Sequence, residues 1–276
     1  METLTDVAIN PDPYLQRGDL VGSAFFIESM AFVVIVIYLL FQLNEVPRRW
    51  RNQLLIGALV AMIAGINVFF RRDFWVQTQT LPVEFRFFDW FMTVPLMVAQ
   101  FYLILRPLGA RIGMLVRIVF ASLWMLLFGY LGEALTPENV VMNGLLGTLG
   151  LLGIIAVILL EGYPRVMKRS DDPAVRRGYL ALSILLPVGW VVYPLGYMFA
   201  PGNIWEGAMS AEAVSVMYSI SDVVNKGGQA LIIYFIAIFS KEATGLAPDL
   251  PGRAAFLPNS TERPKLKTPL QQGEPV

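Results

Sequence analysis

Seven apolar stretches dominate this chain and limit the folds that it can adopt. Each is close to or longer than the roughly 20 residues that an α-helix needs to cross a bilayer. They cover residues 20–42, 53–71, 85–105, 112–132, 141–161, 178–199 and 210–240. They are too long for the strands of a membrane β-barrel and do not alternate in polarity. The sequence therefore predicts an all-α membrane protein, a seven-transmembrane-helix bundle.

Positive charge in the links between these stretches predicts the orientation of the bundle. Cytoplasmic loops of membrane proteins carry an excess of Lys and Arg. In this chain such residues gather in alternate links, at Arg48, Arg49, Arg51, Arg106, Arg111, Arg165, Lys168, Arg169, Arg176 and Arg177. The links "GEALTPENV" and "APGNIWEGAMSAE" contain no Lys or Arg, although Arg71 and Arg72 are exceptions on that side. We expect an outside N-terminus, a cytoplasmic C-terminus and a multi-pass protein of the cell (inner) membrane.

The two ends of the chain differ from the helical core. Residues 1–19 are acidic and contain Pro11 and Pro13, so they lack the features of a signal peptide and predict a short extracellular segment. Residues 242–276 are rich in Pro, Gly and polar residues, which predicts a disordered cytoplasmic tail. Residues 20–241 form the predicted seven-helix domain.

Composition removes several kinds of chemistry. The chain has no cysteine and no histidine, which excludes disulfides and thiolates and removes the commonest metal ligand. We therefore predict no metal site. Net charge is zero and only 15% of the residues are charged, so nothing indicates a nucleic-acid partner. Any proton chemistry must use carboxylates, lysine, tyrosine or water.

The last apolar stretch contains a charged pair, Asp222 and Lys226, one helical turn apart. A charge at the centre of a membrane helix costs about 3 kcal/mol on insertion scales. A salt bridge along one helix is the simplest interpretation, although a buried pair of this kind gains little over apolar residues. The alternative is that the lysine condenses with an aldehyde to form a Schiff base, whose cation would need carboxylate counterions.

The third stretch carries a polar stripe. Its members are separated by three or four residues and so share one helical face: Arg86, Asp89, Thr93, Met97 and Gln100. A polar seam between helices is the other interpretation. The charges of Arg86 and Lys226 balance those of Asp89 and Asp222 only if the third and seventh spans touch. The sequence therefore predicts that contact.

Aromatic residues suggest a slot for a flat apolar ligand. Trp90 adjoins Asp89, and the segment "PVGWVVYPLGY" places Trp190, Pro194 and Tyr197 on one helical face with Tyr193 close by. Aromatic residues on membrane helices more often mark packing or interfacial belts, so this cluster alone decides nothing.

Together these motifs resemble those of the microbial rhodopsins, and are closest to the proteorhodopsin branch of light-driven ion pumps. "RFFDWFMTVPLMVAQFYLIL" resembles the third helix of that family, "WVVYP" its sixth helix and "SDVVNK" its retinal-lysine motif, so the resemblance covers residues 20–240. It implies that Lys226 binds all-trans retinal covalently as a protonated Schiff base. It also implies a light-driven transporter or photoreceptor rather than an enzyme.

The resemblance implies a role for each matched position. Asp89 would be the primary counterion and proton acceptor, and Asp222 the second counterion. Arg86 would be the outer gate, and Thr93 would hydrogen-bond to Asp89. The retinal pocket would be formed by Trp90, Met97, Trp190, Tyr193, Pro194 and Tyr197. An apolar residue at the position of Met97 goes with green absorption in proteorhodopsins.

Two positions depart from the family pattern. Gln100 replaces the glutamate that donates a proton from the cytoplasmic side, and an amide cannot give up a proton at useful pH. Asn67 replaces the histidine that many proteorhodopsins have beside the counterion. The third-helix motif, Asp-Thr-Gln, lies one change from the Asn-Thr-Gln of chloride pumps and two from the Asn-Asp-Gln of sodium pumps. We expect slow, pH-dependent reprotonation by water.

The expected function is outward proton transport across the membrane. We expect the protein to lie in the lipid bilayer as a homo-oligomer, from trimer to hexamer. A slow-cycling photosensor is the main alternative. An inward proton pump stays open, because direction depends on access after isomerisation. An anion pump would need a neutral Asp89, and sodium transport lacks its motif.

Three further features have more than one interpretation. Glu28 could help proton exit, form a subunit contact or face water. Gly227 and Gly228 could allow close helix packing or water entry. The glycines of the fifth span could serve helix packing or leave a lipid-facing opening for a carotenoid antenna; they are Gly147, Gly150 and Gly153.

Overall fold

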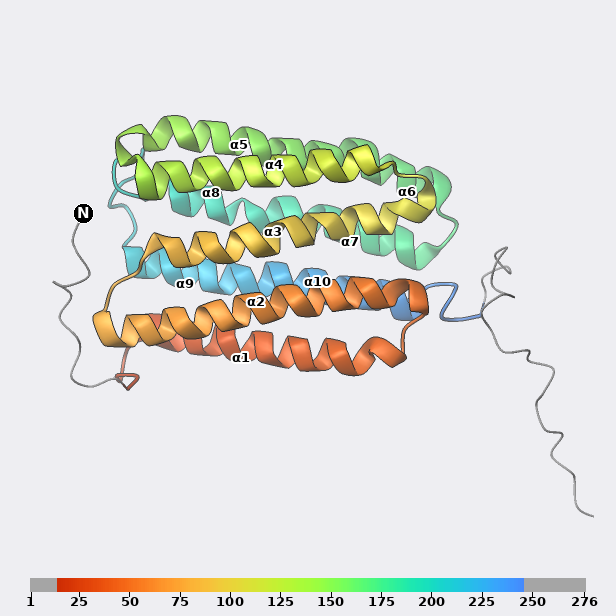
Figure 1. The fold of residues 1–276 in the computed structure, drawn as a ribbon, viewed down its shortest axis with the longest axis horizontal. Helices are drawn as coiled ribbons and strands as arrows, with labels where there is room; N and C mark the ends of the chain where they lie inside the picture. Colours follow the sequence, from red (N-terminus) through yellow and green to blue (C-terminus); the bar gives the residue numbers. More distant parts are fainter. Residues whose placement is uncertain (1–13, 246–276) are drawn as a thin grey trace, which may run out of the picture.

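The computed structural model describes residues 14–245 and contains a bundle of long helices (Figure 1). Most of the predicted extracellular segment and of the predicted cytoplasmic tail lies outside these residues. Within them, seven helical segments are long and apolar enough to cross a membrane, as the sequence predicts. No strand occurs in this part of the chain.

The first four spans are each built around one α-helix. They are α1 (Leu20–Phe41), α2 (Arg48–Thr78), α3 (Val83–Leu105) and α4 (Ile112–Tyr130). The last three spans each combine two helices. They are α5 (Val140–Ala156) with α6 (Tyr163–Arg169), α7 (Pro173–Trp190) with α8 (Val192–Tyr197), and α9 (Ala211–Asp222) with α10 (Gly228–Phe239).

Helix α2 is much longer than the apolar stretch at 53–71 that predicts it. Its first turns hold Arg49 and Arg51, and its last turns hold Arg72 and Asp73. Hydropathy marks where the membrane begins and ends, whereas the backbone hydrogen bonds of a helix continue into polar surroundings. The predicted boundaries therefore follow the apolar core of each helix and not its ends.

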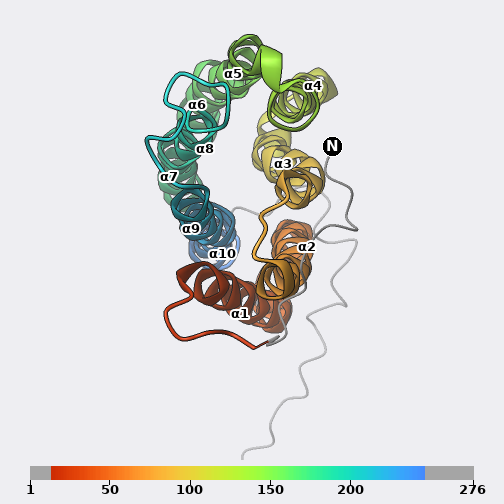
Figure 2. The same ribbon diagram turned by 90° about the vertical axis from the view of Figure 1, so that its left-hand side faces the viewer.

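The helices form a closed ring in which neighbours in sequence are neighbours in space. Figure 2 shows α1, α2, α3, α4 and α5 in succession, and the last span closes the ring, with α9 against α1 and α10 against α2. The third and seventh spans lie deepest. In each of them 56% of the most apolar window is buried, against 22% in the fourth span. The polar stripe of α3 and the charged pair of the last span therefore share the interior.

A π-helical turn, η7 (Val223–Gly227), separates α9 from α10 and contains Lys226. Such turns occur mostly as one-turn insertions in α-helices and are frequent at functional sites. The turn widens the last span where the lysine leaves the backbone, and nothing in the sequence pattern predicts it.

Candidate functional site

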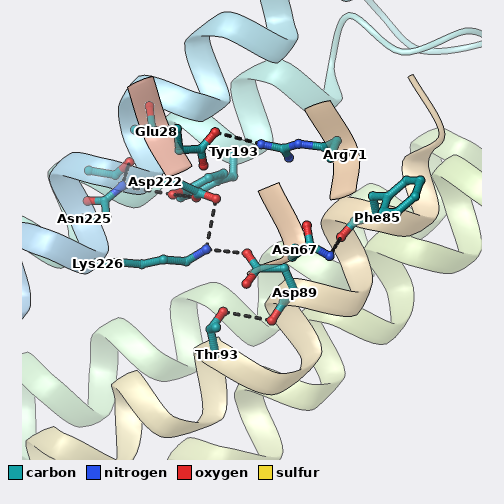
Figure 3. Close-up of polar contacts among 12 residues, drawn as sticks. Glu28, Asn67, Arg71, Phe85, Asp89, Thr93, Tyr193, Asp222, Asn225 and Lys226 are labelled. Atoms are coloured by element: carbon teal, nitrogen blue, oxygen red, sulfur yellow. Dashed lines mark hydrogen bonds and ion pairs between the residues drawn. The ribbon is translucent and has the colours of Figure 1, made fainter. Parts of the chain in front are cut away.

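Lys226 lies between two aspartates in the interior of the bundle. Its Nζ contacts Asp89 Oδ2 of α3 and lies 3.0 Å from Asp222 Oδ2 (Figure 3). Each of these three side chains is only 3% exposed. The contact that charge balance predicts between the third and seventh spans is therefore confirmed. The simpler interpretation, a pair confined to one helix, is incomplete because Asp89 completes the group.

Asp222 is held by a chain of hydrogen bonds from neighbouring helices. Tyr193 Oη donates to Asp222 Oδ1 at 2.6 Å, and Asn225 Nδ2 donates to Tyr193 Oη at 3.2 Å and to the Gly189 carbonyl at 3.1 Å. This carboxylate therefore accepts hydrogen bonds from both a phenol and an ammonium group.

The carboxylate of Asp89 accepts fewer hydrogen bonds than that of Asp222. Thr93 Oγ1 donates at 2.9 Å to the main-chain carbonyl of Asp89 and not to its carboxylate. Asn67 Nδ2 donates to the Phe85 carbonyl at 3.0 Å, one turn earlier on α3. Asp89 Oδ1 is buried, and no other side chain or main-chain group in the described residues hydrogen-bonds to it. The contact with Lys226 is thus the main restraint on this carboxylate.

A cavity of about 220 Å³ extends from Lys226 between α3, α4, α5 and α8. Every residue predicted for the pocket lines it: Trp90, Met97, Trp190, Tyr193, Pro194 and Tyr197. Trp90 lies edge-on to Tyr193 and to Tyr218, with ring centroids 5.2 and 5.6 Å apart. The walls are largely aromatic and aliphatic, and Lys226 is among the residues that line them. A flat polyene aldehyde that condenses with this lysine fits these walls.

Two pocket neighbours escape prediction from the sequence. Tyr218 of α9 donates a hydrogen bond to the Tyr193 carbonyl at 3.0 Å. Glu133, in the π-helical turn η4 (Leu131–Leu135) that follows α4, contacts Arg86. Arg86 also lies over the Tyr218 ring, 4.9 Å from its centroid. The predicted gate arginine therefore points to Glu133 and Tyr218. The only hint of this in the sequence is that two acids, Glu133 and Glu138, occur in "GYLGEALTPENV".

A second buried ion pair joins α1 to α2. Arg71 Nη2 lies 2.8 Å from Glu28 Oε2, and their side chains are 6% and 1% exposed. The idea that Glu28 faces water is therefore wrong. Arg71 also covers the Phe25 ring at 4.3 Å. Spacing along one helix could not reveal this pair, because its members belong to different spans.

On the other side of Lys226, three glutamines connect α2, α3 and α10. Gln100 Nε2 donates to the Gln53 carbonyl at 2.9 Å, and Gln53 Nε2 donates to the Gln100 carbonyl at 3.2 Å. Gln229 Nε2 donates to Gln100 Oε1 at 2.8 Å and to the Met97 carbonyl at 2.9 Å. We call Gln53, Gln100 and Gln229 the amide network. Of these three glutamines, only Gln100 is singled out by its place in the sequence.

The glycines singled out in the sequence serve mainly in packing. A Cβ on Gly150 would lie 2.6 Å from the Ala121 carbonyl oxygen of α4, and one on Gly147 would lie 3.2 Å from that of Met125. Gly153 faces Ala121 more loosely, at 3.4 Å. A Cβ on Gly227 would lie 2.8 Å from Ile35 of α1. Close helix approach, the favoured interpretation, therefore holds at Gly147, Gly150 and Gly227, whereas Gly153 has ordinary space.

Comparison with known proteins identifies the family and matches the fold. The family model described as bacteriorhodopsin-like protein matches residues 19–239. The blue-light absorbing proteorhodopsin of Gamma-proteobacterium Hot 75m4 is 33% identical over 227 residues, covering 81% of this chain and 88% of the relative. The green-light absorbing proteorhodopsin of Gamma-proteobacterium EBAC31A08 is 30% identical over 229 residues, covering 81% and 89%. The crystal structure of blue light-absorbing proteorhodopsin from Med12 superposes with a TM-score of 0.69 at 27% identity, over 80% of this chain and 98% of that chain.

Proposed function

Because the chain belongs to the bacteriorhodopsin-like family of microbial rhodopsins, we propose that it moves protons outward across the cell membrane when illuminated. Members of the family bind retinal through a lysine, and the chain is a multi-pass light-driven ion pump near the proteorhodopsins. The observation that carries the proposal is the position of Lys226, in the lining of an aromatic cavity and between two carboxylates.

Lys226 is the residue that would hold the retinal. Among the described residues it is the one buried lysine, since Lys168 is exposed and Lys241 is partly exposed. Retinal supplies the light-driven isomerisation that changes the position and acidity of the proton on Lys226 Nζ. Trp90, Trp190 and Tyr193 would confine the flat polyene, and the aliphatic walls would keep bulk water from it.

Asp89 is the better placed of the two carboxylates to accept the proton. Its Oδ2 contacts Lys226 Nζ, so transfer breaks one N–H bond and forms one O–H bond without moving either helix. Asp222 already accepts a hydrogen bond from Tyr193, which stabilises its ionised form. Asp89 therefore receives the proton, and Asp222 stays charged.

Reprotonation of Lys226 has no carboxylate to draw on. The buried charged side chains of the described residues are Glu28, Arg71, Arg86, Asp89, Asp222 and Lys226. None of the carboxylates among them belongs to the half of the bundle that contains the amide network. A proton from that side must arrive by water, so the return step is slow and its rate falls as the proton concentration on the cytoplasmic side falls.

The charge distribution supports an outside N-terminus. Arg71 and Arg72, the exceptions to the loop pattern, lie inside α2 and not in the link that follows it. Arg71 is also buried in the interior of the bundle, where it contacts Glu28. The links that remain on this side of the bundle carry few free cations, as expected for the outer face.

The decisive test is the light-induced pH change of a cell suspension that expresses the protein. Outward pumping predicts acidification of the medium that a protonophore abolishes. Alkalinisation that a protonophore abolishes would instead show inward proton transport. Alkalinisation that a protonophore increases would show transport of an anion or of sodium. The two aspartates beside Lys226 would repel an anion bound next to this lysine.

A photosensor is the second candidate, and the amide network favours it. Slow reprotonation prolongs whatever state follows proton transfer, which suits signalling. A photocycle without any protonophore-sensitive pH change would favour the sensor over the pump.

A further inference from the structure

The pair formed by Glu28 and Arg71 has no part in the retinal pocket, yet it lies beside the aspartates. Figure 3 shows Glu28 of α1 next to Asp222, with Arg71 reaching across from α2. Glu28 interacts electrostatically with Asp222 and Lys226, and Arg71 with both Glu28 and Asp89. Ser219 of α9 also lies near the Glu28 carboxylate. Five charged side chains therefore form one buried cluster: Glu28, Arg71, Asp89, Asp222 and Lys226.

The charges of this cluster do not balance if all its members are ionised. Three carboxylates face two cations, and Arg86 is engaged elsewhere by Glu133. An uncompensated charge in a buried site is strongly unfavourable. The cluster reaches neutrality by keeping one proton among Glu28, Asp89 and Asp222.

Within the part of the chain that the structure describes, buried carboxylate oxygens of both pairs lack hydrogen-bond partners. Glu28 Oε1 and Asp89 Oδ1 are buried, as is Asn67 Oδ1 of α2, and the hydrogen bonds of the described residues do not include them. Buried polar atoms of this kind are where internal water binds in proteins. A water chain along α1, α2 and α9 would connect Asp89 to Glu28.

We propose that Glu28, paired with Arg71, is the group from which the transported proton leaves the protein. This inference rests on the proposed outward proton transport. When Lys226 Nζ gives its proton to Asp89, the three carboxylates together hold two protons, and Arg71 balances the one that remains ionised. The O–H bond of Glu28 then breaks, and its proton passes to the outside. Asp89, which holds the proton from Lys226, supplies the proton that Glu28 next requires.

The alternative exit lies on the opposite wall, through Arg86 and Glu133. That pair joins α3 to the turn after α4, whereas the electrostatic neighbours of Asp89 are Lys226, Asp222 and Arg71. The arrangement of charge therefore favours the route between α1 and α2. Toward the outer end of α2, Trp75 Nε1 donates to Asp19 at 3.0 Å.

The test is the timing of proton release in the retinal-bound protein, followed with a pH-indicating dye after a light flash. In the unmodified protein, release should follow the loss of the proton from Lys226 directly. In Glu28→Gln it should be delayed on the order of 100-fold, to the end of the cycle. The infrared difference spectrum should also lose a carboxyl C=O band, which Glu28→Asp should restore at a shifted frequency. Glu84→Gln, an exposed acid at the same end of the bundle, is the matched control.

Glu28→Gln leaves Arg71 buried without its partner, so the double variant Glu28→Gln with Arg71→Gln guards against misfolding. It should fold, bind retinal and release the proton late. Release with normal timing in both variants, with an unchanged carboxyl band, would overturn the assignment of Glu28 as the release group. It would leave the proposed proton transport intact. Delay in Glu133→Gln and not in Glu28→Gln would move the exit to the other wall. Absence of a proton signal in the unmodified protein would overturn the proposed transport itself.

Discussion

At the residue scale, the contacts of Lys226 with Asp89 and Asp222 follow from the need to neutralise buried charge. The sequence contains two acids and a lysine in apolar surroundings, and the need to neutralise them predicts that α3 meets the last span. The structure confirms this contact. Charge alone could not predict that Arg86 meets Glu133 or that Arg71 meets Glu28, because each pair depends on how two helices are rotated about their axes.

Replacing Asp89 tests its role as proton acceptor. Asp89→Asn should abolish light-driven acidification, because the group in contact with Lys226 Nζ can no longer accept a proton. Asp222 should still support retinal binding. The absorption maximum should move to longer wavelength, since less negative charge stabilises the cation at Lys226. Asp73→Asn, an exposed acid, is the control. Undiminished acidification in Asp89→Asn would contradict the assignment.

Gln100→Glu tests the cause of slow reprotonation. A protonated glutamate could reproduce both hydrogen bonds of the amide, donating to the Gln53 carbonyl and accepting from Gln229. The new carboxyl should accelerate the decay of the deprotonated state by on the order of 100-fold and make it less dependent on pH. Flash photolysis between about pH 6 and 9 measures both effects. A decay that is already fast and pH-independent in the unmodified protein would refute the explanation.

At the scale of single helices, hydropathy predicts every span but not its detailed form. The apolar core of α2 is visible in the sequence, whereas its polar last turns are not. The π-helical turn at Lys226 is likewise hidden, since one extra residue in a helical turn leaves no mark on composition. Small residues are more informative, because glycines on a membrane helix indicate close packing.

The contact between α4 and α5 allows a matched pair of substitutions. Gly150→Ala should destabilise the protein by about 1–3 kcal/mol, because the added methyl group meets the backbone of α4. Gly153→Ala, one turn away, has ordinary space and should be neutral or slightly stabilising. Thermal loss of the visible absorption band compares the two. Equal stability of both variants would show that the helices can separate without penalty.

At the scale of the whole molecule, short links explain why consecutive helices are neighbours in the ring. The orientation of the bundle across the membrane is predicted instead from the Lys and Arg residues near the helix ends. The chain contains no cysteine, so single cysteines can report the exposure of each face. In intact cells a membrane-impermeant thiol reagent should label Ala208→Cys and not Lys168→Cys. The opposite pattern would invert the bundle. The predicted assembly of three to six subunits can be measured on the same material, and it stays a prediction.

The amide network has a consequence for the cell in darkness. A membrane potential of about 100 mV favours the return of each proton by about 2.3 kcal/mol, so any internal carboxylate that helps a pump to refill also offers a path for leakage. Gln53, Gln100 and Gln229 cannot bind or release a proton at cellular pH. If the proposed transport holds, we expect a bundle of this kind to turn over slowly under bright light and to lose little of its gradient in darkness.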